Sequence, residues 1–413
     1  MDRVIRTGVV GLSGRGTYWA RMYDAPGHPG FQLTAVCDVN PDRLAEGRAL
    51  YGDRVRYYES ADALAADEAV DAVLVATDDP HHVAPSLAGL RAGKHVLVEK
   101  PLCQSIDDAR LLIAEARTAP GIFMIGFELR DCTVFQTMKR LLDEGRIGPV
   151  KVGHAFDNVA VGGRYFFHDP QSQKAYYKSL LLQKACHSLD LLNWFMDSEP
   201  VRVYGIGGQA VFGTGRNPAE RCRDCPRADT CPYFIRSEVE LDYGGVSRHS
   251  YDACVWRADL DLDDHSLLAI TYANDAKATF HENHFTPEYS REFWLTGTAG
   301  KMYGYYDNPG RFLVRVEYAH DRERRTEEWK PPHTGGSHGG GDNRLRDEFY
   351  RRIVENDPPT EAHASAYYST ALALRAQESI DAGQALDIPP LNADGWQRQR
   401  QQQQNTNGTD ANG

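Results

Sequence analysis

Segments typical of strands and of helices alternate along the first 126 residues, and no other feature constrains the fold as strongly. Short apolar runs rich in valine, typical of buried strands, are separated by segments with helical spacing. We interpret as strands the runs at 5–12, 31–38, 55–58, 72–77, 95–99 and 122–127. This alternation predicts an α/β fold with a doubly wound parallel sheet, because right-handed crossovers leave little choice of topology.

A glycine-rich loop directly follows the first predicted strand and precedes a helix. Gly11 would allow the tight turn, Gly16 would let the helix approach the strand, and the helix N-terminus would hold a pyrophosphate. The second strand ends in Asp38, where dinucleotide-binding units place a carboxylate that binds the adenosine ribose. Its charge would repel a 2′-phosphate, which favours NAD over NADP. Ser13 replaces the second glycine, and it must fit a permitted conformation or loosen the phosphate contact.

The predicted strand at 95–99 ends abruptly in the charged sequence Glu99-Lys100-Pro101. Proline cannot donate to the hydrogen-bond ladder, so the strand must end here. Ligands of open α/β sheets bind outside the carboxyl ends of the strands, so Lys100 would lie where cofactor and substrate meet. The alternative is a solvated lysine at an ordinary strand end.

Short strands predominate from residue 201 onward. The strands predicted in this half are 150–156, 201–207, 238–243, 267–272, 277–284, 292–297 and 311–318. Runs of strands after an alternating half predict a C-terminal α+β domain with a large, mostly antiparallel sheet and helices on one face. We therefore expect a nucleotide-binding domain at 1–126, a substrate-binding and oligomerisation domain at 127–392, and a disordered glutamine-rich tail at 393–413.

A predicted helix at 180–195 carries polar side chains in an otherwise apolar sequence. Gln183, Lys184, His187 and Asp190 lie three or four residues apart and therefore form one stripe. The stripe either faces water or lines a site. A histidine takes up a proton near neutral pH without help, whereas a lysine needs its pKa lowered first.

The chain resembles the Gfo/Idh/MocA family of oxidoreductases, which includes glucose–fructose oxidoreductase and inositol dehydrogenase. The resemblance rests on the glycine loop at 11–16, Asp38, the segment 76–82 and the segment 93–101, Gly-Lys-His-Val-Leu-Val-Glu-Lys-Pro. It implies a Rossmann domain, with Lys100 at the nicotinamide and the substrate. The cofactor contacts that it implies are Gly11, Ser13, Gly14, Arg15, Gly16, Asp38, Thr77, His82, Glu99 and Lys100. For His82 the alternative is a polar residue that caps the following helix.

The resemblance also implies a second catalytic group on the helix at 180–195, because His187-Ser-Leu-Asp190 matches the family's histidine and aspartate. We assign His187 as the base that takes the hydroxyl proton and Lys100 as the group that polarises the reacting oxygen, though these roles could be exchanged. Many family members have an aspartate four residues before the histidine, where this chain has Gln183. Glutamine cannot take a proton, so Lys184 or Asp190 could take over part of that role.

A glycine-rich segment at 335–342 precedes a predicted helix at 344–355. The bare sequence predicts only a linker, but related proteins carry a similar Gly-His-Gly-Gly-Gly-Asp stretch at this point. This likeness makes His338 and Asp342 candidates for closing over the substrate. The candidate substrate residues are therefore Arg130, Gln183, His338 and Asp342.

Three cysteines with metal-like spacing, Cys222, Cys225 and Cys231, lie close together in the second half. Thiolates suit tetrahedral zinc, and a structural zinc site here would brace a loop rather than carry catalysis. The residues that could supply a fourth ligand through the fold are Cys254, His249 and His265. A local disulfide and three free cysteines are the alternatives.

Charge and hydropathy argue against several classes of function. A net charge of −12 and a pI near 5.7 do not fit a nucleic-acid surface, and no apolar run is long enough to span a membrane. No secretory signal is visible and the eight cysteines form no disulfide pattern, so a cytoplasmic protein is expected.

The family resemblance implies an NAD(P)-dependent dehydrogenase that acts on a CH–OH group of a sugar, sugar acid or cyclitol, as a homodimer or homotetramer. Two other functions stay open at this point. One is redox-neutral chemistry that keeps NAD bound, such as glycoside cleavage or epimerisation. The other is a non-catalytic nucleotide-binding sensor, which the departures at Ser13 and Gln183 would fit.

Overall fold

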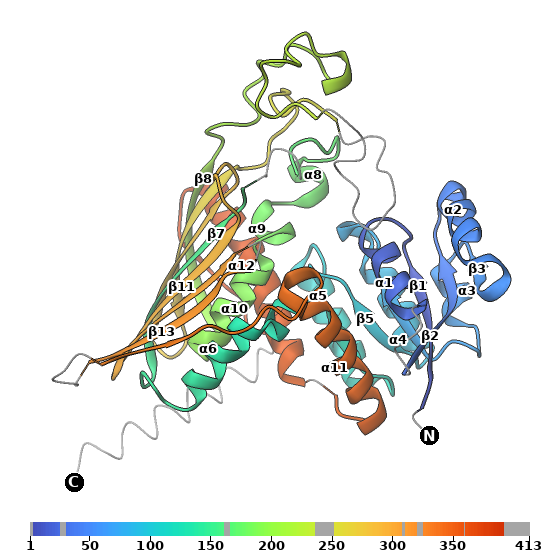
Figure 1. Cartoon of the computed structure of the whole chain (residues 1–413), viewed down its shortest axis with the longest axis horizontal. Helices are drawn as coiled ribbons and strands as arrows, with labels where there is room; N and C mark the ends of the chain where they lie inside the picture. The colour runs from blue at the N-terminus through green and yellow to red at the C-terminus, as the bar shows by residue number, and fades with distance from the viewer. Residues whose placement is uncertain are drawn as a thin grey trace.

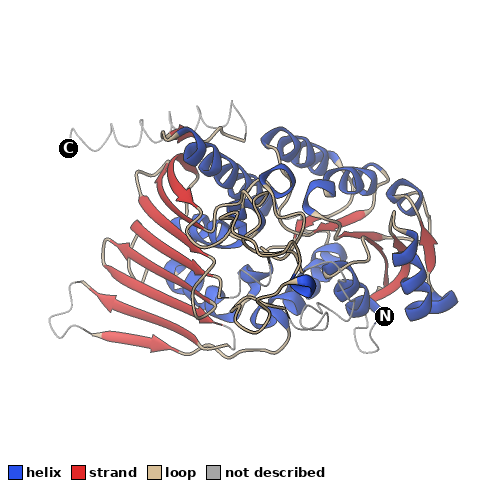
Figure 2. Cartoon of the chain, turned by 90° about the horizontal axis from the view of Figure 1, so that it is seen from above, coloured by secondary structure: helices blue, strands red, loops and turns tan. Residues whose placement is uncertain are grey.

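The computed structural model describes residues 3–24, 30–160, 166–235, 252–307, 310–319, 325–358 and 360–391. Two sheets organise these residues, and helices lie between them (Figure 1 and Figure 2). The tail predicted at 393–413 and the strand predicted at 238–243 lie outside the described residues. Among the described helices, none is both long and apolar enough to cross a membrane.

The first sheet has six parallel strands in the order β3-β2-β1-β4-β5-β6. Its strands are β1 (Ile5–Val10), β2 (Phe31–Cys37), β3 (Arg56–Tyr58), β4 (Ala72–Val75), β5 (His95–Val98) and β6 (Phe123–Ile125). The helices beside them are α1 (Arg15–Asp24), α2 (Pro41–Tyr51), α3 (Ala61–Ala65), α4 (Val83–Arg91) and α5 (Ile106–Thr118). The predicted Rossmann fold is confirmed, and its strand order reverses between β1 and β4, where such sheets bind ligands.

Side-chain caps fix the start of three of these helices. The side chains of Asn40, Ser60 and Ser105 accept hydrogen bonds from backbone N–H groups in the first turns of α2, α3 and α5. The first N–H groups of a helix have no partner within the helix, so a short polar side chain just before it stabilises that end. Each of these helices therefore begins close to where the sequence predicts it, directly after a capping side chain.

The second sheet has nine strands in the order β14-β13-β12-β11-β7-β10-β9-β8-β15. They are β7 (Val150–Asn158), β8 (Pro200–Gly208), β9 (His265–Tyr272), β10 (Lys277–Asn283), β11 (Ser290–Gly297), β12 (Gly300–Asp307), β13 (Phe312–Tyr318), β14 (Thr326–Trp329) and β15 (Leu386–Asp387). Only β7 and β10 pair in parallel, so the mostly antiparallel sheet is confirmed. β12 was not predicted, because its two glycines and many polar groups hide the strand pattern.

Helices cover one face of the second sheet and leave the other face open. The covering helices are α6 (Thr133–Asp143), α10 (Cys186–Met196) and α12 (Thr360–Ala382), and the short helix α9 (Leu180–Gln183) packs against α10 and α12. Figure 2 shows the sheet along one side of the molecule, with helices only on the inner side. Apolar side chains that remain exposed on the outer face are Val152, Tyr204, Ile206, Leu267 and Trp294.

Helix α11 (Gly341–Glu355) comes from the C-terminal part of the chain but packs into the first core. Its residues Leu345, Phe349 and Ile353 belong to the same buried cluster as Ile5 and Phe31. The rings of Phe31 and Phe349 stack with centroids 6.2 Å apart. The domain boundary at residue 126 stays a prediction, and the first core is complete only with this late helix.

Candidate active site

A cavity of about 370 Å³ lies between the carboxyl end of the parallel sheet and the helices that cover the second sheet. Its first wall follows strands β1, β4 and β5 and carries Ser13, Arg15, Thr77, Asp79, His82, Glu99 and Lys100. Its second wall comes from the rest of the chain and carries Glu128, Gln183, Lys184, His187, Tyr289 and His338. The cavity thus occupies the place where open α/β sheets bind their ligands.

The glycine loop of the first wall leaves no room for side chains at two of its glycines. Gly11 has a φ of 93°, and a Cβ there would lie 2.6 Å from the oxygen of Ala76. A Cβ on Gly16 would lie 1.8 Å from the oxygen of Gly11. These are the tight turn and the close approach that the sequence predicts. Ser13 is not among the residues with positive φ, so it takes the permitted conformation.

Asp38 is fixed at the edge of the glycine loop. Its Oδ2 accepts a hydrogen bond from the backbone N–H of Leu12 at 2.7 Å, and its Oδ1 accepts one from Asn40 at 2.8 Å. Each carboxylate oxygen keeps a further lone pair, because a carboxylate accepts about four hydrogen bonds. Asp38 can therefore hold the loop and still accept a hydrogen bond from a ligand.

Lys100 reaches across the cavity from the end of β5. Its Nζ donates a hydrogen bond to the backbone oxygen of Gln183 at 2.7 Å. Burial alone would lower the pKa of Lys100, but the acidic groups around it, among them Cys186, Asp79 and Glu99, outweigh burial and raise it. Lys100 is therefore a cation that can polarise a substrate oxygen, and it is not poised to act as a base.

Arg15 links the glycine loop to helix α11. Its Nε donates to Glu99 at 2.7 Å, and its terminal nitrogen donates to Asp342 at 2.5 Å. Glu99 also accepts a hydrogen bond from Trp19 Nε1 at 2.6 Å. Two predicted site residues, Glu99 and Asp342, are thus brought together by the guanidinium of a third.

His82 ties together two loops of the first wall. Its ring nitrogens lie 2.7 Å from the oxygen of Pro101 and 3.1 Å from the oxygen of Thr77. Burial lowers its pKa, so the ring is neutral near pH 7 and donates one N–H. Its side chain makes no capping bond to helix α4. His82 therefore positions the loop of Lys100 rather than capping a helix.

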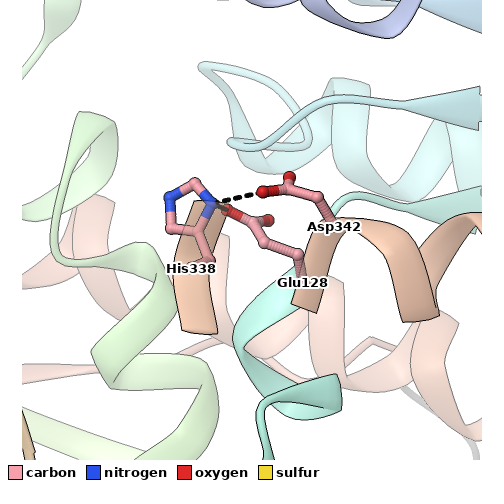
Figure 3. Close-up of side chains that lie close together, drawn as sticks. All are labelled: Glu128, His338 and Asp342. Atoms are coloured by element: carbon pink, nitrogen blue, oxygen red, sulfur yellow. Dashed lines mark hydrogen bonds and ion pairs between the residues drawn. The ribbon is translucent and has the colours of Figure 1, made fainter. Parts of the chain in front are cut away.

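Glu128 stands at the centre of the second wall, and the sequence did not single it out. Its Oε1 lies 3.1 Å from His338 Nδ1 and 3.3 Å from His187 Nε2. Asp342 Oδ2 lies 2.9 Å from the same nitrogen of His338, so both carboxylates face one ring nitrogen (Figure 3). Burial alone would raise the pKa of Glu128, but His187, His338 and Arg15 outweigh it and hold that pKa well below its usual range.

His187 is a buried, neutral imidazole. Burial lowers its pKa to about 4, although Glu128 opposes the shift. Nε2 faces the ionised carboxylate of Glu128, so the ring hydrogen belongs on Nε2. Nδ1 is then an acceptor, and it has no partner among the described residues. The arrangement leaves one basic nitrogen at the cavity for a hydroxyl proton.

Buried polar atoms without partners gather around this cavity. Within the described part of the chain, the cavity-lining atoms of this kind are Thr77 Oγ1, Asp79 Oδ2, Glu128 Oε2, Gln183 Oε1 and His187 Nδ1. Buried polar groups are normally paired, because an unpaired one costs about 1–3 kcal/mol. A polar ligand in the cavity would supply the missing partners. Burial also raises the pKa of Asp79 to about 7, against the opposing charge of Lys100.

Lys184 faces a tyrosine that sequence reasoning missed. Its Nζ donates to Tyr289 Oη at 2.8 Å, and Arg291 donates to the same oxygen at 2.8 Å. Burial would raise the pKa of Tyr289, but Arg291 and Lys184 outweigh it and lower that pKa. Because both cationic partners are donors, a neutral Tyr289 keeps its own O–H free for a ligand. Tyr289 is 105 residues from Lys184, and no local motif connects them.

The single helix predicted at 180–195 is wrong, and the structure shows two helices with a break at Lys184 and Ala185. The N–H of Ala185 bonds to the oxygen of Leu180, five residues back, so the turn is one residue wider than in an α-helix. Asp190 consequently does not line the cavity. It pairs with Arg130, whose Nε lies 2.6 Å away, so both predicted site residues are held together outside the cavity.

Comparisons with known proteins identify the family of the chain. Residues 5–127 match the model described as "Oxidoreductase family, NAD-binding Rossmann fold", and residues 135–303 match the Gfo/Idh/MocA C-terminal domain. The putative oxidoreductase YteT of Bacillus subtilis is 25% identical over 78% of this chain and 82% of its own length.

Other relatives match over a shorter span or in fold alone. An inositol 2-dehydrogenase of Saccharopolyspora erythraea is 33% identical over 43% of this chain, which spans about half of that protein (49%). Levoglucosan dehydrogenase in complex with NADH aligns with a TM-score of 0.71 at 17% identity, over 94% of this chain and 100% of that chain. At this identity the likeness supports the fold.

Proposed function

The chain belongs to the Gfo/Idh/MocA oxidoreductase family, and we propose that it is an NAD-dependent dehydrogenase acting on a hydroxyl of a sugar, sugar acid or cyclitol. The observation that carries the proposal is the meeting of cationic Lys100 and neutral His187 in one cavity beside the glycine loop. The relatives named inositol 2-dehydrogenase support the substrate class.

The first wall fits a nicotinamide dinucleotide. Gly11 and Gly16 let the backbone approach a pyrophosphate, and Ser13 takes a conformation that leaves this approach open. Asp38 would hold the ribose, while the unpaired hydroxyl of Thr77 and the ammonium of Lys100 would face the nicotinamide end. When bound, the cofactor accepts the hydride that leaves the substrate carbon.

The second wall would remove the proton. As the hydride leaves, the hydroxyl proton passes to His187 Nδ1, and the alcohol becomes a carbonyl. The imidazolium formed is stabilised by Glu128, which lies 3.3 Å from Nε2. Lys100 would donate to the reacting oxygen and stabilise its developing negative charge. Glu128 thus supplies the carboxylate that Gln183 cannot, and Gln183 Oε1 would accept a hydrogen bond from a neighbouring substrate hydroxyl.

The preference for NAD over NADP rests on Asp38. Its carboxylate is held at the loop edge by the N–H groups of Leu12 and Asn40, so it cannot turn away from a ribose phosphate. Two negative charges at hydrogen-bond distance repel strongly where solvent is partly excluded. Replacement of Asp38 by serine should weaken NAD binding and raise the relative rate with NADP, as initial rates with both cofactors would show.

The outer face of the second sheet supports a homodimer or homotetramer. Five large apolar side chains on neighbouring strands are exposed there, and exposure of Ile206 reaches 57%. An apolar patch on a sheet face of this kind is typical of an interface with another copy of the chain. A double substitution, Ile206→Asp with Leu267→Asp, should produce a smaller species in light scattering, with the cavity residues unchanged.

The test of the proposed function is reduction of NAD by the purified protein with a panel of sugars, sugar acids and inositols. Reduced nicotinamide is followed by its near-ultraviolet absorbance. A polyol-dependent signal that disappears in both Lys100→Ala and His187→Asn supports the dehydrogenase. Product formation without net NAD reduction would instead establish redox-neutral chemistry, and NAD binding without any turnover would establish a sensor.

A further inference from the structure

The described parts of the connection between β8 and β9, residues 209–235 and 252–264, form an excursion that stands beyond the end of the second sheet, at the top of Figure 1. They contain a single 3₁₀ turn and one isolated bridge between Arg221 and Ala253. The segment is held by isolated backbone hydrogen bonds and by a buried apolar cluster that includes Phe212, Val255 and Leu260. The cysteines of the segment do not belong to that cluster.

Four cysteines converge in this excursion. The 3₁₀ turn begins at Cys222, whose oxygen accepts a hydrogen bond from the N–H of Cys225 at 3.0 Å, so both thiols come from one tight turn. Cys254 is brought alongside by the bridge, because the N–H of Cys222 bonds to Asp252 and that of Cys254 bonds to Glu220, both at 2.7 Å. Cys231 completes the set, and all four line one small cavity of about 10 Å³.

Among the described candidates for a fourth ligand, the structure favours Cys254. His265 lies on β9 and bonds through Nδ1 to Asp264 at 2.8 Å, and it does not line the small cavity. His249 lies outside the described residues. His168 does line the cavity, but its two ring nitrogens face backbone oxygens of Ala253 and Tyr233 at 2.7 and 2.8 Å. Cys254 is therefore the thiol that joins the other three.

We propose that Cys222, Cys225, Cys231 and Cys254 bind one zinc ion in a tetrahedral structural site. Four thiols release four protons as they bind, and the site carries two net negative charges. The arginines that flank it, Arg221 and Arg223, both pair with Asp252 beside the bridge. A cavity of this size holds about one atom. None of the four cysteines forms a disulfide, which leaves every sulfur available to a metal.

The acidic group in the active site is a poorer candidate for a cation. Among the described residues, Glu128, His338 and Asp342 are the group whose ligand atoms already lie within 4.8 Å of one another. Arg15 is hydrogen-bonded to Asp342 at 2.5 Å, so that carboxylate already has a cationic partner. The cysteine sulfurs stand wider apart, and a zinc ion would draw them inward by rotation about their Cα–Cβ bonds.

The zinc site would hold one side of the active-site cavity in place. Arg257, three residues after Cys254, donates to the backbone oxygens of Phe167 and Asp169 at 2.6 and 2.7 Å. His168 is held between the backbone oxygens of Ala253, one residue before Cys254, and Tyr233, two residues after Cys231. Asp169 lines the active-site cavity, so loss of the metal should weaken substrate binding more than it slows the chemical step. This last expectation rests on the proposed function, whereas the metal site does not.

The test is the metal content of the full chain purified without chelators. We expect one zinc per chain in the unaltered protein and in Cys103→Ser, a control at a buried cysteine elsewhere. In Cys225→Ser and Cys254→Ser we expect at least a tenfold loss of bound zinc. Cobalt added to the metal-free chain should give the visible bands and thiolate charge-transfer absorption of a tetrahedral sulfur site.

Several results would overturn the proposal. One such result is an unaltered protein without zinc. In that case the four thiols would react freely, or mass spectrometry would find two disulfides, and the site would not exist. Zinc retained at full occupancy in Cys254→Ser would remove Cys254 as a ligand. If the serine variants do not fold, the cobalt spectrum of the unaltered chain decides alone, because an octahedral spectrum contradicts the thiolate set.

Discussion

The two walls of the active-site cavity are built in different ways. The first wall consists of short loops after β1, β4 and β5, and each of its functional groups lies next to the strand that places it. The second wall gathers Glu128, His187, Tyr289 and His338 from positions far apart in the chain. Backbone geometry therefore places the first set, while tertiary packing and buried charge pairs place the second. Single substitutions should act differently on the two walls.

The largest effect should come from Lys100→Ala. This substitution removes the ammonium without disturbing the backbone that holds the cofactor, so turnover should fall about a thousandfold. NAD binding, measured by fluorescence titration, should be nearly unchanged. Lys151→Ala, at an exposed lysine on β7, serves as the matched control and should keep full activity. Loss of NAD binding in Lys100→Ala would show that the first wall is not set by its backbone alone.

The next effect contrasts two positions in the glycine loop. A Cβ on Gly16 would lie 1.8 Å from the oxygen of Gly11, so Gly16→Ala should distort the loop at a cost of about 3 kcal/mol. NAD affinity should then drop about a hundredfold. Ser13→Ala, which adds no atoms, should keep affinity within about twofold. Equal losses in both variants would contradict the fit of Ser13 to the loop.

A smaller effect is expected from Glu128→Gln in the second wall. Burial lowers the pKa of His187 to about 4, and the charge of Glu128 keeps that pKa from falling further. Removal of the charge leaves His187 a weaker base, so kcat/KM should fall about tenfold. The acid limb of the pH profile should move to lower pH, because His187 then protonates less readily. Glu68→Gln, at an exposed carboxylate, should change neither rate nor profile. A limb that does not move would show that His187 is not the titrating base.

The smallest effect concerns stability, and it compares one histidine from each wall. Burial lowers the pKa of both His82 and His187 below the unfolded value near 6.5. Between pH 6.5 and the folded pKa, the unfolded chain binds protons that the folded chain does not, so stability falls as the pH falls. The melting temperature should drop between pH 7.5 and 5, by about 2 °C for each kcal/mol. His187→Asn should show a smaller drop than the unaltered chain, and an equal drop would contradict this origin.

Sequence reasoning found the first wall because its signals are local. Ser13, Thr77 and Lys100 each lie in a loop directly after a recognisable strand, and the chain direction at the end of that strand decides where they lie. The sequence alone left open whether Ser13 fits where the motif has a glycine. The backbone of Ser13 does not have a positive φ, so a serine fits there without strain. Where a motif and its strand are adjacent, the fold leaves the side chain little freedom.

Two groups of the second wall, Glu128 and Tyr289, escaped prediction for a physical reason. Glu128 has no partner near it in the sequence, because its contacts are His187 and His338. The widened turn before His187 depends on a hydrogen bond from Ala185 to Leu180 that no spacing rule foresees. The predicted helix stripe therefore included Asp190, which the structure turns away to Arg130. The one available signal for Glu128 was its position directly after the strand predicted at 122–127, where an acidic residue can face a ligand.

The packing of α11 into the first core has a consequence for how the chain is made. Phe31 is buried against Phe349 and Tyr350, and the Cβ of any residue replacing Gly30 would meet the ring of Tyr350. On a ribosome that adds about 5–20 residues per second, Phe31 would wait on the order of fifteen to sixty-five seconds for Phe349. During this interval the nascent chain exposes the apolar surface that α11 later covers. Contacts between residues so far apart in the chain give a high contact order, and the first domain cannot finish folding before α11 has been made.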